Sequence, residues 1–276
     1  MVDVFIVPYL HRSIGCECLQ DDTCVALAWM PLGKLVAVTK GEVLLFGMRD
    51  RGVERLARRA SDVSLDADFV DAVVNCTNGL LYVACSSGKI LVFDAAAQLL
   101  ATIDSPGNPS AIGLCGTRVV VGDIGGTIHI FDSVTMARER SLPFQDHVRA
   151  ARCAGGSAAP YTAPITALTG TGDTLLVRSA DSLLLALDLV KLRVAGFVLG
   201  HFGAVPCVAF DPANPHTFAS GSTDQSVMLW TILGMRTATG LLDLPKAIDR
   251  RMSYLRRVWN QPSGPRGAVI PTAIVV

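Results

Sequence analysis

Short apolar runs alternate with polar turn clusters along most of this chain, and helical periodicity is almost absent before residue 244. The runs are rich in Val, Ile, Leu and Thr, whereas Gly, Asn, Asp and Ser gather between them. Runs of this length between turn clusters predict antiparallel strands joined by tight turns. We therefore expect an all-β fold.

One unit recurs five times along the chain, and each copy has a bulky residue six positions after a tight turn. The turns at 40, 87, 125, 181 and 224 are separated by 47, 38, 56 and 43 residues. Two strands are expected before each turn, and an outer fourth strand is indicated at 99–103 and 193–199. An irregular repeat of this length with four strands is typical of a β-propeller blade. The bulky residues are Phe46, Phe93, Phe131, Leu187 and Trp230.

The fifth unit, residues 200–231, carries a more specific pattern. Gly200 and His201 precede its first strand, SGSTDQS spans its turn, and its third strand ends in MLW. This unit resembles a WD40 repeat, a family in which a His, a Ser or Thr, an Asp and a Trp form a hydrogen-bonded network that locks the blade. The resemblance implies a structural network of His201, Asp224, Trp230 and Ser220, with Ser222 as the other candidate for the serine.

The other four units match the family pattern loosely. The resemblance as a whole covers about residues 22–232. The turn aspartate is replaced by Lys40, Ser87 and Gly125 and returns only as Asp181, while the tryptophan does not return. The resemblance therefore implies a WD40-like propeller over residues 1–232 with about five recognisable four-stranded blades.

The sequence leaves several ways for the ring to close, because the family norm is seven blades and only five units are recognisable here. Five blades could close the ring, further strands at the chain ends could add a blade, or a partner could complete an open ring. The run at 3–7 suits a strand that completes the last blade, and the run at 268–276 is a second spare strand. An open ring would leave a strand edge that a native protein must cover.

The C-terminal extension, residues 233–276, departs from the strand pattern. Asp243 suits a helix cap and Pro262 a helix end, which predicts a helix over about 244–260. Its apolar stripe could pack on the propeller, in a partner's groove or against RNA, and the lack of a matching acidic run on the propeller slightly favours an external partner. The stripe is Ile248, Met252, Leu255 and Trp259, flanked by Arg250, Arg251, Arg256 and Arg257.

Composition and charge narrow the classes of function. Lys plus Arg and Asp plus Glu each total 24, and this balance argues against a domain built mainly to hold a nucleic-acid backbone. Mean hydropathy is +0.43, but we expect neither a membrane-spanning segment nor a signal peptide. Eight scattered cysteines favour reduced thiols in a cytoplasmic or nuclear protein over a disulfide framework.

No residue pattern indicates catalysis or a cofactor. The glycine strings at 122–127 and 170–174 precede strands, so they are neither phosphate loops nor dinucleotide fingerprints. Cys16, Cys18 and Cys24 lack a fourth zinc ligand at suitable spacing, and His201 with Asp224 fits a structural pair better than a catalytic one. We expect no enzyme activity, metal, cofactor or small-molecule substrate.

The expected function is a non-catalytic scaffold or adaptor that mediates protein–protein interactions as one subunit of a larger complex. Its partners would be other protein subunits, docked on rim loops, on a strand edge or on the C-terminal helix. The alternative is an RNA-associated subunit of a ribonucleoprotein, which would contact RNA through the basic helix and Arg49, Arg51, Arg55, Arg58 and Arg59.

Overall fold

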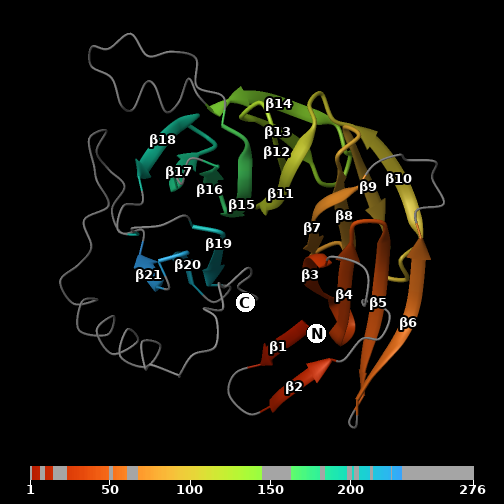
Figure 1. Ribbon diagram of the computed structural model, residues 1–276. Coiled ribbons are helices and arrows are strands. Elements are labelled where there is room, and N and C mark those ends of the chain that lie inside the picture. Colours follow the sequence, from red (N-terminus) through yellow and green to blue (C-terminus); the bar gives the residue numbers. More distant parts are fainter. Residues whose placement is uncertain are drawn as a thin grey trace, which may run out of the picture. The chain divides into compact units, whose positions relative to one another are not determined.

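The computed structural model places strands throughout the repeat region. It describes residues 2–6, 10–14, 24–49, 52–60, 68–144, 163–180, 184–197, 201, 205–211, 214–224 and 226–231. The chain forms two compact units, Met1–Asp104 and Ser105–Val276, which are coloured red to yellow and yellow to blue in Figure 1.

The first unit holds one hairpin and two four-stranded antiparallel sheets. The hairpin pairs β1 (Val2–Ile6) with β2 (Leu10–Ile14). The first sheet has the order β3 (Cys24–Met30), β4 (Lys34–Thr39), β5 (Glu42–Arg49) and β6 (Gly52–Ala60). The second consists of β7 (Phe69–Asn75), β8 (Leu80–Cys85), β9 (Lys89–Phe93) and β10 (Leu99–Asp104).

The second unit holds three antiparallel sheets. The third sheet consists of β11 (Pro109–Cys115), β12 (Arg118–Asp123), β13 (Thr127–Asp132) and β14 (Arg138–Pro143). The fourth consists of β15 (Ile165–Thr171), β16 (Thr174–Ser179), β17 (Leu184–Asp188) and β18 (Arg193–Phe197). In its described part the fifth consists of β19 (Cys207–Asp211), β20 (Asn214–Gly221) and β21 (Val227–Thr231).

Five blade-like sheets of consecutive antiparallel strands confirm the predicted architecture. The outer strands expected at 99–103 and 193–199 are β10 and β18. In the fifth sheet three strands lie within the described residues, so its fourth strand stays a prediction, and β1 pairs with β2. The proposal that residues 3–7 complete a blade stays a prediction. The C-terminal extension, with its expected helix at 244–260, lies outside the described residues.

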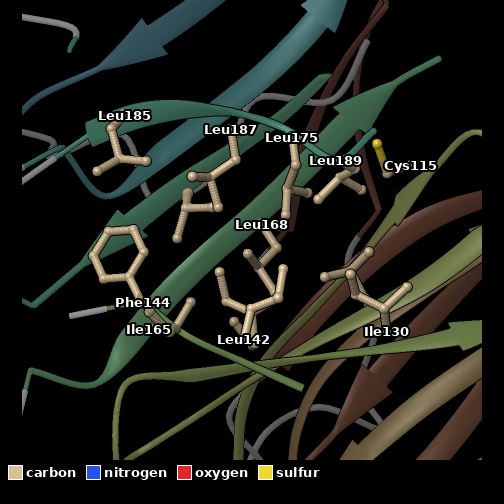
Figure 2. Packing of buried hydrophobic residues seen from close by; sticks show 14 residues of the cluster. Cys115, Ile130, Leu142, Phe144, Ile165, Leu168, Leu175, Leu185, Leu187 and Leu189 are labelled. Carbon is tan, nitrogen blue, oxygen red and sulfur yellow. The ribbon is translucent and has the colours of Figure 1, made fainter. Parts of the chain in front are cut away.

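One core cluster of buried apolar side chains lies between the third and fourth sheets (Figure 2). Val120 of β12 and the alternate residues Ile128 and Ile130 of β13 belong to this cluster, and side chains of β15, β16 and β17 meet them from the next sheet. Burial of this apolar surface on both sides is what joins neighbouring sheets. The cluster includes Val120, Ile128, Ile130, Leu142, Phe144, Ile165, Leu168, Leu175, Val177, Leu185 and Leu187.

Glycines bring the first strands of these two sheets unusually close. A methyl group on Gly113 in β11 would lie 2.4 Å from the carbonyl oxygen of Leu168 in β15. One on Gly170 would lie 2.6 Å from the sulfur of Cys115, whose thiol also reaches the carbonyl oxygen of Gly172 at 3.4 Å. We call this contact between β11 and β15 the glycine seam. It requires glycine for space, because a side chain would meet backbone atoms.

Candidate functional site

The structure brings His201, Ser220, Asp224 and Trp230 together in the fifth sheet. His201 Nε2 lies 2.7 Å from Ser220 Oγ on β20, and His201 Nδ1 lies 3.3 Å from Asp224 Oδ2 in the following turn. Trp230 Nε1 on β21 donates to the same Ser220 Oγ at 2.7 Å. The four side chains therefore connect the segment before β19 with β20, the turn and β21.

The hydrogen bonds fix the proton order along this network. The indole N–H of Trp230 can only donate, so Ser220 Oγ accepts from it and donates its own proton to Nε2 of His201. The Nδ1–H of His201 then donates to the Asp224 carboxylate, which can only accept. Burial lowers the pKa of His201, although the charge and hydrogen bond of Asp224 oppose the shift. A neutral imidazole satisfies all of these bonds.

Ser222 and Ser226 both form hydrogen bonds with Asp224 in the turn. Ser222 is the other serine that the sequence offered for the network. Ser222 Oγ accepts from the Asp224 amide at 3.1 Å, so Ser222 shapes the turn while Ser220 contacts His201 and Trp230. Ser226 donates to the Asp224 carboxylate through its amide and its hydroxyl, and its Oγ also lies 3.0 Å from His201 Nδ1. Ser220 is therefore the residue that occupies the network position.

Aromatic rings enclose the network on the side of the strands. Trp230 stacks on Phe218 with ring centroids 6.0 Å apart, and Phe218 meets Phe210 edge-on at 5.7 Å. The ring of His201 approaches Trp230 edge-on at 6.2 Å. The rings exclude water from the Ser220 hydroxyl, which strengthens its hydrogen bonds.

A second buried network, which the sequence interpretation missed, lies in the third sheet. His129 Nε2 on β13 lies 3.2 Å from Asp123 Oδ2 on β12, and His129 Nδ1 lies 2.9 Å from Ser141 Oγ on β14. The other oxygen of Asp123 accepts the Thr127 amide at 2.6 Å. Only 4% of His129 and 7% of Asp123 are exposed, so these bonds link three strands inside the sheet.

The sequence contained a signal for this second network. His129 stands between Ile128 and Ile130 in an apolar strand, and a buried imidazole needs hydrogen-bond partners. Asp123, six residues earlier at the end of the preceding strand, is within reach across a tight hairpin. The family pattern places its histidine before the first strand instead, so the resemblance concealed this pair.

The partner-binding residues proposed for the tail, Ile248 to Trp259, lie outside the described residues. Of the arginines proposed for RNA contact, Arg55, Arg58 and Arg59 lie on β6, the outer strand of the first sheet, and Arg49 ends β5. Arg51 lies outside the described residues.

The described residues also show whether the chain has features for membrane insertion, metal binding or disulfide formation. Within them, no helix has the length and apolar character needed to cross a membrane, and no three His, Cys, Asp or Glu side chains gather as metal ligands. Cys24, Cys76, Cys85, Cys115 and Cys207 are free thiols. Burial raises the pKa of Cys85 to about 11 and that of Cys115 to about 12.

Comparisons with known proteins agree with this geometry. The family model described as "WD domain, G-beta repeat" matches residues 193–231, the segment that holds the His201 network. No curated protein sequence matches the chain.

Several solved structures share the fold at low sequence identity. The structure of U3-55K and the crystal structure of the RRP9 WD40 repeats each match 78% of this chain at 13% identity and a TM-score of 0.62. The computationally designed Ika8 protein matches 78% at 16% identity and a TM-score of 0.54. The match covers 63%, 62% and 60% of those chains respectively, so this chain spans about three fifths of their length.

Proposed function

Because this chain belongs to the WD40-repeat β-propeller family, we propose that it acts as a non-catalytic scaffold, one subunit of a larger protein complex. The observation that carries the proposal is the bonding of the His201–Asp224 pair. Both ring nitrogens of His201 are engaged by Ser220, Asp224 and Ser226 inside the blade. A histidine used in this way locks strands together, so the pair serves the rigidity on which a binding surface depends.

The partner contact that we propose is the amphipathic segment at 244–260. An isolated helix of this length is marginal in water and gains its order from packing. Its stripe of Ile248, Met252, Leu255 and Trp259 would lie in an apolar groove of a partner subunit, with the arginines at the groove's rim. The five free cysteines in the described part of the chain agree with a reducing cytoplasmic or nuclear compartment.

The second candidate function, an RNA-associated subunit, is favoured by the position of the β6 arginines. β6 is the outer strand of its sheet, and it carries Arg55, Arg58 and Arg59 against one acid, Glu54. Such a strand, together with the basic flank of the tail, would neutralise several backbone phosphates.

Two matched variants of the tagged full chain separate these functions. Ile248→Asp with Leu255→Asp disrupts the apolar stripe, and Arg250→Gln with Arg257→Gln removes flank charge but keeps the stripe. Scaffold docking predicts that stoichiometric protein partners are lost from the purified complex only with the stripe variant. RNA binding predicts loss with the flank variant and a steep decrease with salt. A wild-type chain that purifies without a stoichiometric partner would contradict the scaffold function.

A further inference from the structure

The buried network of the third sheet differs from the His201 network in the position of its serine. In the His201 network the serine, Ser220, is fully buried. In the third sheet the serine is Ser141, which is exposed on the outer strand β14, while His129 beside it is only 4% exposed. The third sheet therefore joins a buried histidine to a serine that molecules in solution can approach.

The hydrogen bonds of this network assign the position of each proton. The Asp123 carboxylate can only accept, so Nε2 of His129 carries the imidazole proton and donates it to Asp123 Oδ2 at 3.2 Å. Nδ1 of His129 is then unprotonated, and Ser141 Oγ, 2.9 Å away, donates to it. A serine bonded to a base that is itself oriented by a carboxylate is the arrangement that activates a hydroxyl nucleophile.

The surroundings of Asp123 hold this arrangement in one orientation. Its other oxygen accepts the Thr127 amide at 2.6 Å, and the side chain is 7% exposed. The backbone at Gly107 packs against the carboxylate so closely that a methyl group on this glycine would collide with Oδ2. A carboxylate shielded from water in this way fixes the imidazole tautomer and stabilises the positive charge of His129 when it takes up a proton.

The strand register places a hydrogen-bond donor beside the Ser141 hydroxyl. The Phe144 amide donates to the Gly126 carbonyl, and the same register pairs His129 with Ser141 three positions further along the ladder. Hydrogen-bonded pairs alternate in an antiparallel ladder, so His129 and Ser141 form a non-hydrogen-bonded pair, in which the side chains lie closer together. The Ser141 amide therefore points away from β13, where it can donate to the oxygen of a carbonyl group under attack by Oγ.

We propose that Ser141 is a covalent acceptor site, a nucleophile that takes an acyl group from an activated ester. Oγ attacks the carbonyl carbon and passes its proton to Nδ1 of His129. The bond between that carbon and the leaving oxygen then breaks, and the leaving group departs with the electron pair of this bond and the proton from His129. The products are an ester on Ser141 and a free hydroxyl compound. His129 is the general base and Asp123 its positioning residue.

Acetylation of the full-length chain by p-nitrophenyl acetate tests this assignment. Peptide mass spectrometry follows the acetyl group on Ser141 and on two serines that serve as internal controls. Ser86 is exposed and its Oγ accepts from the Asp68 amide, so it reports the reactivity of an ordinary serine. Ser220 bonds to His201 but is buried, so it should stay unmodified. We expect Ser141 to react at least about 100-fold faster than Ser86, as general-base catalysis provides.

The variant Asp123→Asn separates activation of the serine from a purely structural role. Its amide oxygen can still accept from the Thr127 amide, but its NH2 group donates to Nε2 and moves the imidazole proton to Nδ1, so Ser141 becomes an acceptor. Acetylation of Ser141 should then decrease at least about 100-fold in a variant that circular dichroism shows to be folded. Ser141→Ala should remove the adduct at this position and leave acetylation of Ser86 unchanged.

Unfolding of the wild type provides a test that needs no variant. In urea that unfolds the chain, Ser141 should react no faster than Ser86. The proposal is overturned by a native Ser141 that reacts like Ser86, by equal rates in the native and unfolded chains, or by a folded Asp123→Asn variant that keeps the wild-type rate. Each of these results would leave the scaffold function untouched, because that function does not depend on Ser141.

Discussion

Replacement of Ser220 by alanine should destabilise the protein more than the same replacement at Asp224 or at Ser222. Ser220 is fully buried, and its Oγ lies 2.7 Å from both Trp230 Nε1 and His201 Nε2. Its removal leaves two buried polar groups without this partner. Each such group costs about 1–3 kcal/mol, but losses within one network are not fully additive, so we expect a loss of roughly 2–4 kcal/mol in the free energy of unfolding.

We expect a smaller loss in the free energy of unfolding when Asp224 or Ser222 is replaced by alanine. Asp224→Ala removes an acceptor, but Ser226 Oγ remains 3.0 Å from His201 Nδ1, so we expect about 1–2 kcal/mol. Ser222→Ala is the matched control, because Ser222 is equally buried and its hydroxyl accepts from the Asp224 amide at 3.1 Å. We expect about 1 kcal/mol for this variant.

Urea unfolding followed by circular dichroism measures all three variants under identical conditions. The difference between the Ser220→Ala and Ser222→Ala midpoints, multiplied by the common slope, gives the energetic contribution of the network beyond an ordinary buried serine. If Ser220→Ala is no more destabilising than Ser222→Ala, the network is not a lock, and the energetic reasoning from its hydrogen bonds is wrong.

Three further predictions concern pH, packing and thiol reactivity. Because burial holds the pKa of His201 below its ordinary 6.5, the unfolded chain gains a proton first as the pH falls. Stability should therefore be complete above about pH 6.5 and decrease below it, and His201→Asn should flatten urea midpoints measured across this range. Gly113→Ala should cost about 1–3 kcal/mol by thermal unfolding because its methyl group would meet the Leu168 carbonyl, whereas Gly41→Ala, with no atom within 4 Å, should be nearly neutral. At pH 8, iodoacetamide should label the exposed Cys76 long before the buried Cys115, whose pKa is about 12; equal labelling by mass spectrometry would contradict this burial.

The inner strands could be predicted from sequence because they are buried on both faces. β8, β12 and β16 read as nearly continuous apolar runs, and each lies just before one of the predicted turns. The outer strands β6 and β14 lack this signal. β14 reads RERSLP, and its first four residues are exposed, so its charges resemble those of a loop. Pairing with β13, a long-range contact, makes it a strand.

The two buried hydrogen-bond networks also differ in how far the sequence predicts them. The His201 network could be read from the sequence because its residues stand at fixed offsets that the family resemblance supplies. The Asp123–His129 pair left a signal in the sequence, but the complete network could not be predicted, because its third member, Ser141, lies on β14, which the apolar pattern did not reveal. Buried polar groups find partners by proximity in space, and that proximity appears only when the outer strand is in place.

The glycine seam has a consequence for how this protein can change over time. Because β11 and β15 approach each other closely at the seam, any side chain larger than glycine there would push the two strands apart. We therefore expect substitutions and insertions between residues 145 and 162 to cost less stability than substitutions of the seam glycines. The seam glycines, in contrast, tolerate almost no exchange. We therefore expect sequence variation between residues 145 and 162 and little variation at the seam glycines.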